Sequence, residues 1–315
     1  MAASVFDNSL FPMGLREFKM FRTLIHRHTG IWLRDGKQIM LASRLSRRLR
    51  HHGIASFAEY YEYVQREPGN SVEIRELINC VTTNKTSFFR EPHHFQFLAN
   101  TVVPQIQSAA RQGTSRRIRI WSAACSTGEE PYSIAITLLE ALQASQSART
   151  QPVAKPGPIR RALPELSVVP GSWTIEIVAS DIDTNVLGIA ALGMYSIDSL
   201  AGVDASFKKK YFLRGKDDMQ GKAKVKPDVA RLVQFKRINL QDARWPLEGS
   251  FDVIFFRNAL IYFNQKTQDA FLRKMACFLN PNGYLFLGNS EHIPWLQDIF
   301  SPLNQTMYRL RDEKK

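Results

Sequence analysis

Small and polar residues follow each of four short apolar runs that lie beyond residue 117. A carboxylate at such a position can bind a ribose diol, and small residues let a ligand approach the backbone. If the runs are parallel strands, these residues meet at one edge of the sheet, because ligands of open parallel sheets bind outside the carboxyl ends of the strands. The sequence therefore predicts a nucleoside-binding crevice built from residues 123–131, 180–183, 238–240 and 257–260.

The turn at 123–131 lacks the Gly-x-Gly-x-x-Gly fingerprint of dinucleotide-binding proteins. It carries Glu129 and Glu130 at the start of a predicted helix, where two carboxylates would repel a pyrophosphate. This charge disfavours NAD, FAD and nucleoside triphosphates. It favours a nucleoside with a cationic or zwitterionic tail, of which S-adenosylmethionine is the common example. The alternative is that both glutamates only complement the helix dipole.

A second polar cluster occupies residues 82–91, where threonines, Asn84 and Arg90 stand beside Phe88 and Phe89. This composition suggests a linker folded over a pocket. The alternative is a helix N-cap with an aromatic plug into the core.

The segments that must hold these clusters in place show two different sequence patterns. Residues 14–80 place apolar side chains at three- and four-residue spacing, as at Leu41, Leu45 and Leu49, and predict a small all-helical domain. From residue 117 onward, short apolar runs alternate with helical patterns, which predicts βαβ units and a parallel sheet covered on both faces. The predicted strands are 118–121, 174–179, 232–235, 251–256 and 284–287.

Two segments interrupt this alternation. Residues 143–171 hold five of the fifteen prolines, and we expect them to form a mobile surface insertion because they cannot bury enough apolar surface. Residues 205–240 are basic and contain short alternating stretches, which predicts a β-excursion rather than another crossover helix.

The net charge of +13 is concentrated in residues 1–60, with a surplus of +6, and residues 205–240, with a surplus of +8. Each patch should attract an acidic partner: nucleic acid, an anionic membrane or an acidic protein surface. No run approaches the roughly eighteen apolar residues of a membrane helix, and the first twenty residues have no signal-peptide core. Three widely spaced cysteines favour a reducing compartment. We therefore expect a cytoplasmic protein.

Five stretches of the chain occur in an order that matches one known family. Residues 82–91 and the stretch Trp-Ser-Ala-Ala-Cys-Ser-Thr-Gly-Glu-Glu-Pro-Tyr-Ser at 121–133 come first. Residues 179–183, 256–263 and 288–291 follow. Together they resemble the chemotaxis receptor methyltransferases of the CheR type over roughly residues 15–310.

The resemblance implies an α/β chain with an N-terminal all-α helical domain (1–82) that docks on the receptor and a linker or lid (83–92). The remainder, 93–315, would be a Rossmann-like class I methyltransferase domain that depends on S-adenosylmethionine. Residues 143–171 would be a flexible insertion in it, and 205–240 the small antiparallel β-subdomain of the family.

The implied reaction is methyl esterification of glutamate side chains on the cytoplasmic coiled-coil signalling domain of chemoreceptors, giving glutamate 5-O-methyl ester and S-adenosylhomocysteine. A glutamate carboxylate is already ionised at neutral pH, so no general base is needed. The resemblance implies that Arg90 and Tyr262 act at the reacting centre, whereas Cys125 is interpreted as a small filler. The implied cofactor-binding residues are Asn84, Thr86, Arg90, Ala124, Glu130, Asp181, Asn239, Leu240, Asn258 and Ala259.

A cluster of basic residues on a helix is usually a solvated face. The resemblance implies instead that this cluster docks on the acidic receptor bundle; its members are Arg44, Arg47, Arg48 and Arg50. In some members of the family the β-subdomain binds a C-terminal receptor pentapeptide. Residues 214–217 lack the associated Gly-x-Gly turn, so we expect a pentapeptide-independent enzyme. We expect no metal site from the seven histidines, no nucleic-acid partner, no membrane insertion and a monomer.

Two other functions stay open. A nucleic-acid methyltransferase would suit the positive charge, but amino-methylating enzymes of that class usually carry Asn/Asp-Pro-Pro-aromatic where this chain has Arg257-Asn258-Ala259-Leu260. A non-catalytic signalling module that binds S-adenosylmethionine is the other alternative.

Overall fold

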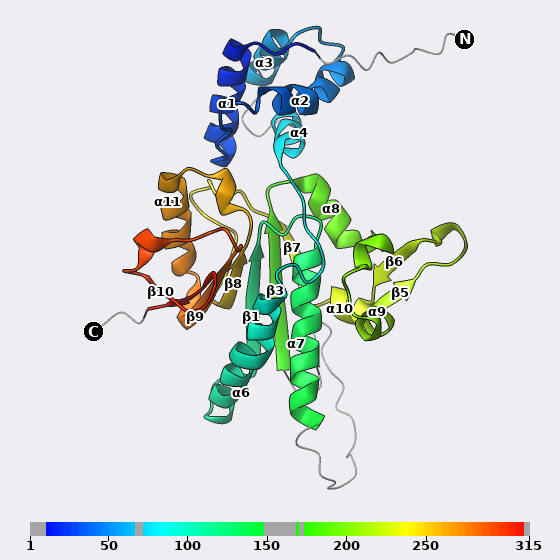
Figure 1. The fold of residues 1–315 in the computed structure, drawn as a ribbon, viewed down its shortest axis with the longest axis vertical. Coiled ribbons are helices and arrows are strands. Elements are labelled where there is room, and N and C mark those ends of the chain that lie inside the picture. The colour runs from blue at the N-terminus through cyan, green and yellow to red at the C-terminus, as the bar shows by residue number, and fades with distance from the viewer. Residues whose placement is uncertain (1–10, 67–71, 148–167, 170–172, 312–315) are drawn as a thin grey trace.

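The computed structural model describes residues 11–66, 72–147, 168–169 and 173–311. Its first part is a group of four helices, drawn in blue and cyan at the top of Figure 1. Their common core is apolar and includes Phe21, Leu41, Leu45 and Tyr60, all fully buried. The all-helical prediction is therefore confirmed. The helices are α1 (Leu15–Thr29), α2 (Gln38–His52), α3 (Phe57–Arg66) and α4 (Val72–Val81).

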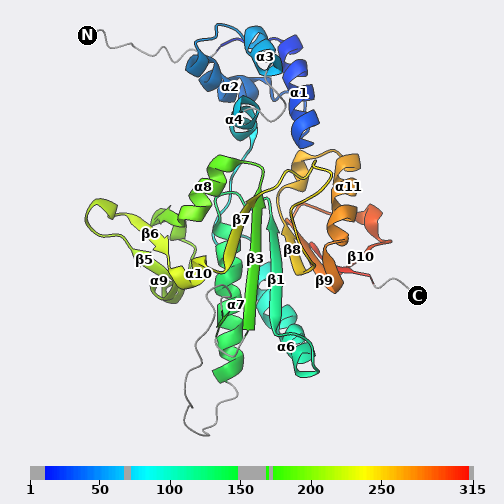
Figure 2. The same cartoon turned by 180° about the vertical axis from the view of Figure 1, so that it is seen from behind.

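A linker leads from α4 to the second part, which is built around an eight-stranded mixed sheet (Figures 1 and 2). Five parallel strands lie in the spatial order β7-β3-β1-β8-β9, and each overlaps one of the predicted apolar runs, so the parallel sheet is confirmed. Three antiparallel strands at the edges, β2, β10 and β11, were not predicted. The strands are β1 (Arg117–Ala123), β2 (Val168–Val169), β3 (Trp173–Asp181), β7 (Val233–Arg237), β8 (Phe251–Phe256), β9 (Leu279–Leu287), β10 (Phe300–Pro302) and β11 (Met307–Leu310).

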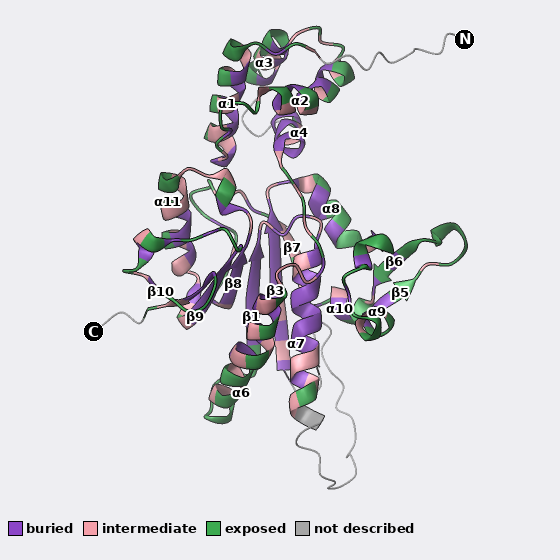
Figure 3. Ribbon diagram, in the orientation of Figure 1, coloured by how far each residue is buried: buried purple, intermediate pink, exposed green. Residues whose placement is uncertain are grey.

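Helices cover both faces of this sheet, because successive strand residues point to opposite sides. On β1, Ile120 packs in one core cluster with Ile136 of α7, whereas Trp121 packs in another with Leu272 of α11. The central strands are accordingly buried in Figure 3. The helices of this part are α5 (Pro92–Phe97), a π-helical turn (Leu98–Val102), α6 (Val103–Arg111), α7 (Glu129–Ser147), α8 (Thr184–Leu192), α9 (Ala205–Tyr211), α10 (Pro227–Ala230) and α11 (Gln265–Ala276). None of the helices in the described ranges is long and apolar enough to cross a membrane.

A small antiparallel sheet of three strands projects from the large one. The small sheet and the predicted 205–240 segment differ in extent. The sheet begins earlier, at β4, whereas the predicted segment also contains α9 and ends in β7, which belongs to the large sheet. The prediction missed β4 because three residues are too few to show a period of two. The strands are β4 (Met194–Ser196), β5 (Phe212–Arg214) and β6 (Lys222–Val225), in the order β4-β6-β5.

The predicted mobile insertion at 143–171 is wrong at both of its ends. α7 continues to Ser147, and the Ser145 hydroxyl donates a hydrogen bond to the Ala141 carbonyl oxygen (2.9 Å). β2 pairs with the start of β3. The last turn of α7 was not predicted because its composition is polar. A helix end that extends past the sheet needs no apolar face. The rest of the insertion, 148–167 and 170–172, lies outside the described residues.

Candidate active site

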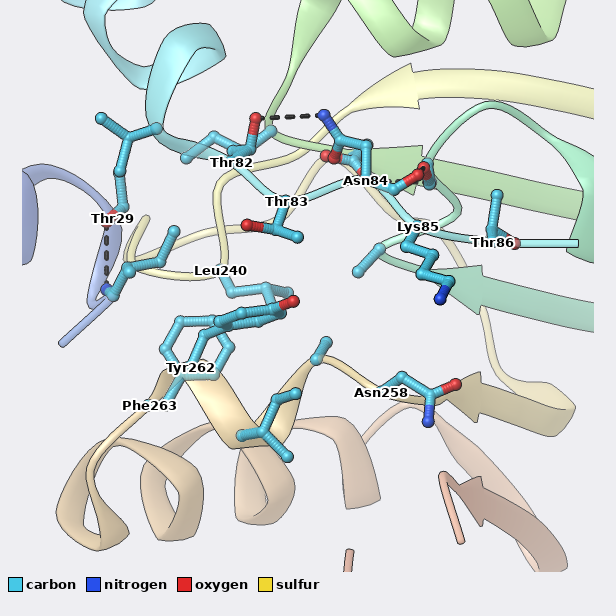
Figure 4. Close-up of a pocket in the computed structure, with 18 of the residues that line it drawn as sticks. Thr29, Thr82, Thr83, Asn84, Lys85, Thr86, Leu240, Asn258, Tyr262 and Phe263 are labelled. Atoms are coloured by element: carbon cyan, nitrogen blue, oxygen red, sulfur yellow. Dashed lines mark hydrogen bonds between the residues drawn. The ribbon is translucent and has the colours of Figure 1, made fainter. Parts of the chain in front are cut away.

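One pocket of about 610 Å³ lies where the linker and the helical part meet the carboxyl ends of the central strands. This is the volume of an ordinary cofactor site, roughly 300–1,000 Å³. In Figure 4, Thr82 and Thr86 of the linker lie across the pocket from Tyr262 and Asn258. Every residue predicted to bind the cofactor or to act in catalysis lines this one pocket: Asn84, Thr86, Arg90, Ala124, Glu130, Asp181, Asn239, Leu240, Asn258, Ala259 and Tyr262.

The turn after β1 forms the floor of the pocket. Ala124 and Ser126 have left-handed backbones, with φ of 61° and 51°. Asp181, at the end of β3, stabilises this turn by accepting hydrogen bonds from the backbone N–H of Ser126 (2.8 Å) and of Asp183 (3.0 Å). Burial raises the pKa of Asp181, and these backbone donors oppose the rise. Burial also raises the pKa of Cys125, so its thiol stays neutral, as expected of a small filler.

The two glutamates at the start of α7 have different surroundings. Glu129 accepts a hydrogen bond from the Thr127 hydroxyl (2.6 Å) and does not line the pocket. Glu130 lines the pocket, accepts a hydrogen bond from the Ser122 hydroxyl (2.6 Å), and pairs with Arg257 (3.2 Å). Burial raises the pKa of Glu130, while Arg257 opposes the rise. A simple complement to the helix dipole thus fits Glu129 but not Glu130.

The linker is attached to the end of β3 through Asp183. One oxygen of this carboxylate accepts hydrogen bonds from the Thr82 hydroxyl (2.6 Å) and the Asn84 amide (2.8 Å), and the other caps α8. Further along, Phe88 is buried and packs edge-on against Tyr195. The linker therefore has both proposed features, since residues 82–87 line the pocket and Phe88 plugs into the core.

Sequence reasoning missed two partners of the pocket, Arg257 and Glu91. The Arg257 guanidinium is 1% exposed; it pairs with Glu91 (2.9 Å) and Glu130 (3.2 Å) and donates a hydrogen bond to the Arg90 carbonyl oxygen. Burial opposes the ionisation of Glu91, but Arg257 together with the Asn289 and Asn258 donors outweighs it, so the pKa of Glu91 lies below its usual range. No sequence signal joins two residues 166 positions apart, although Arg257 immediately precedes the predicted Asn258.

Asn258 is held in a left-handed conformation, with φ of 58°, by two carboxylates. Its side-chain amide donates to Glu91 (3.2 Å), and its backbone N–H donates to Glu291 (2.8 Å). Glycine is required at position 288, because a Cβ there would lie 2.3 Å from the Asn258 amide nitrogen. The amide of Asn258 is thus fixed at the pocket wall.

The helical part reaches the rim of the pocket. The backbone N–H of Trp32 donates to the carbonyl oxygen of Tyr262 (2.8 Å), and the Asn239 amide donates to the carbonyl oxygen of His28 (2.7 Å). The guanidinium of Arg90 donates to the Lys85 carbonyl oxygen (2.9 Å), within the linker itself.

Charge is unevenly distributed over the pocket. Apart from Glu130 and Asp181, the described residues lining it include no carboxylate, and they include no histidine. Asp181 is buried and the Glu130 side chain is 13% exposed, whereas five cations that line the pocket are exposed or half-buried. The cations, beside the paired Arg257, are Arg34, Lys37, Arg44, Lys85 and Arg90.

Three of the four arginines predicted to dock on a receptor have other contacts. Arg44 lines the pocket and donates to the Thr82 carbonyl oxygen (2.9 Å) and the Thr83 hydroxyl (2.9 Å). Arg48 forms a half-buried ion pair with Glu73, which also accepts a hydrogen bond from Tyr60. Arg47 is exposed but its guanidinium donates to the Cys80 sulfur (3.2 Å), and Arg50 is exposed.

His94 borders the Arg257 pair and is fully buried against the ring of Phe286, with ring centroids 5.3 Å apart. Burial, with the nearby charge of Arg257, lowers the pKa of His94 to about 3.

This pKa predicts a pH-dependent stability. Between pH 6.5 and 3 the unfolded chain binds a proton at His94 that the folded chain cannot, so stability falls as pH falls. From pH 7 to pH 5 the loss is about 2 kcal/mol. Urea unfolding at both pH values should show a loss smaller by this amount in His94→Phe, whose ring can keep the stack. His28 and His93, with pKa values also lowered by burial, are present in both proteins. Equal losses in both proteins would contradict the prediction.

Sequence comparisons agree with this geometry. Residues 16–82 match the all-alpha domain of the CheR methyltransferases, and residues 84–155 and 163–309 match their SAM binding domain. Chemotaxis protein methyltransferase 2 of Pseudomonas aeruginosa is 42% identical over 306 residues, which are 96% of each chain. The chemotaxis protein methyltransferase of Salmonella typhimurium is 38% identical over 94% of this chain and 91% of its own. That of Escherichia coli is 38% identical over 93% and 90%. The chain therefore belongs to the CheR family and is a chemotaxis methyltransferase with a domain that binds S-adenosylmethionine.

Proposed function

We propose that this chain transfers a methyl group from S-adenosylmethionine to glutamate side chains on the cytoplasmic signalling domain of chemoreceptors. The products are glutamate 5-O-methyl ester and S-adenosylhomocysteine. The observation that carries the proposal is the charge arrangement of the pocket: it is lined by two carboxylates of low exposure, Asp181 and Glu130, and by five cations that are exposed or half-buried. Exposed cations attract an anionic acceptor.

The interior suits the cofactor. Small residues at 123–126 let a nucleoside approach the backbone. Among the described residues, this turn after β1 carries no cation that could bind a pyrophosphate. Asp181 would bind the ribose hydroxyls, Glu130 would face the cationic end, and Asn258 would offer its backbone and amide. When bound, the cofactor supplies a methyl group on a sulfonium sulfur. A carboxylate oxygen can take this methyl group and displace the sulfur without a proton transfer.

The protein's own residues then have a limited task. A new oxygen–carbon bond forms as the carbon–sulfur bond breaks, and the acceptor carboxylate needs no base because its pKa is about 4.3. Orientation supplies the rate, and well-aligned reactants can gain on the order of 7–11 kcal/mol. We infer that Arg90 orients the carboxylate and that Tyr262 limits its position.

We also propose how the protein meets its receptor. The exposed Arg47 and Arg50 would contact an acidic receptor bundle, independently of a receptor pentapeptide, and a monomer in the cytoplasm would suffice. The alternatives make different predictions: a nucleic-acid methyltransferase would label DNA or RNA, and a non-catalytic module would label nothing.

Transfer of a tritiated methyl group to a purified receptor signalling fragment tests the proposal. We expect label on the fragment that mild base releases as volatile methanol, because esters hydrolyse under conditions in which methylated amines and bases survive. A fragment with its candidate glutamates changed to alanine is the matched control and should stay unlabelled. Base-stable label, or label on nucleic acid alone, would overturn the assignment.

A further inference from the structure

The buried ion pair between Arg257 and Glu91 joins two parts of the pocket that are far apart in sequence. Arg257 directly follows β8 and precedes Asn258, and Glu91 lies near the end of the linker, immediately after Arg90 and before α5. The two side chains meet through two guanidinium nitrogens, at 2.9 and 3.3 Å from the same carboxylate oxygen. Because both donors belong to one planar guanidinium, the contact restricts the angle between the two side chains as well as their distance.

Both ends of this pair act on residues already placed in the site. Arg257 also donates to the backbone oxygen of Arg90 and pairs with Glu130 at 3.2 Å. Glu91 accepts from the Asn258 amide (3.2 Å) and from the backbone N–H of Asn289 (3.2 Å). One cation and one anion thus connect the linker, the start of α7 and the ends of β8 and β9.

The backbone at the linker end supports this arrangement. Glu91 has a left-handed backbone with φ of 58°, although it is not glycine, and Phe89 has φ of 52°. Such residues are uncommon and persist where the surroundings hold them. Arg90 stands between these two residues, so its direction depends on contacts that hold the linker in this form.

We propose that Arg257 and Glu91 are positioning residues of methyl transfer, whose ion pair fixes the linker so that Arg90 faces the acceptor side of the pocket. This rests on the proposed function, since it deepens the role given to Arg90. Neither residue needs to touch the substrate, because each acts through Arg90 and Asn258.

Glu91→Gln is the sharpest variant, because the amide keeps an oxygen for the Asn258 and Asn289 donors but places an uncharged NH₂ group, which cannot accept a hydrogen bond, against Arg257. A misplacement of about 1 Å can cost on the order of 100-fold in rate. We expect kcat to fall on the order of 100-fold, while the KM for the receptor fragment and the Kd for S-adenosylhomocysteine change less than about threefold. Arg257→Lys, which keeps the charge but loses the two-point contact, should lose rate on the order of tenfold.

Glu176→Gln is the matched control. Glu176 also pairs with a largely buried arginine, Arg119, at 2.8 Å, but on β3 and β1 away from this pocket. It should lower thermal stability and leave kcat unchanged. If Glu91→Gln keeps its kcat within threefold of the wild type, or loses kcat only as far as Glu176→Gln does, the proposal is wrong.

A second measurement separates this proposal from the choice of substrate. Amide hydrogen exchange of residues 83–90, with S-adenosylhomocysteine bound, needs no methyl acceptor. We expect faster exchange in Glu91→Gln than in the wild type and in Glu176→Gln. If no glutamate ester forms but this difference is found, the substrate assignment fails and the positioning role stands; equal exchange in all three proteins overturns the positioning role itself.

Discussion

Asp181→Asn is expected to weaken the binding of S-adenosylhomocysteine roughly 10- to 100-fold. Both carboxylate oxygens of Asp181 accept a backbone N–H, one from Ser126 and one from Asp183. An asparagine must turn its NH₂ group toward one of these two backbone N–H groups. That N–H then loses its hydrogen bond and faces another donor. The asparagine also offers only one acceptor oxygen to the ribose hydroxyls that Asp181 would bind. A hydrogen bond to a charged group contributes about 1.5–3 kcal/mol, which corresponds to this range of affinity.

Asp252→Asn is the control for this measurement. Asp252 is also a carboxylate whose pKa burial raises, and it accepts a backbone N–H from Arg119 (2.8 Å) and an amide N–H from Asn280 (2.7 Å). It lies at the start of β8, at a different pocket. Calorimetric titration should show unchanged affinity in Asp252→Asn, even though the protein is less stable. Equal affinity in both variants would remove Asp181 from the cofactor site.

The strand-end residues could be predicted because topology collects them. Asp181, Asn239 and Asn258 each follow an apolar run, and a parallel sheet brings the carboxyl ends of its strands to one edge. Their convergence on one pocket required only the correct identification of the strands. The edge strands escaped prediction because β4 and β10 have three residues each, too few to show a pattern.

The ion pairs could not be predicted for a different reason. Arg44 and Arg48 look like a solvated face, because helical spacing gives the side of a helix but not which element covers it. In the structure the linker accepts hydrogen bonds from Arg44, and Glu73 of α4 pairs with Arg48. Arg257 is buried only because Glu91 and Glu130 approach it from distant segments, and a charge is stable in such a place only when it is paired.

Arg90→Lys is expected to lower kcat on the order of 100- to 1,000-fold, the usual cost of removing one preorganised donor from a reacting centre. The Arg90 guanidinium is anchored by the Lys85 carbonyl oxygen (2.9 Å), which leaves its other nitrogens to face the acceptor. A lysine keeps the charge but has no planar fork to bind a carboxylate in one direction.

The size of this loss distinguishes orientation from simple charge attraction. If Arg90 only attracted the acidic receptor, Arg90→Lys would retain the attraction and kcat would fall less than threefold. If it orients the carboxylate, kcat falls while the affinity for S-adenosylhomocysteine changes less than about tenfold. Single-turnover methyl transfer, with calorimetry for the product, gives both quantities. Arg273→Lys, at an exposed arginine of α11 that pairs with Asp269 and Asp298, should leave both unchanged. Because Lys85 and Arg90 both belong to the linker, a full loss in Arg90→Lys would also make the linker part of the reacting centre rather than a cover over it.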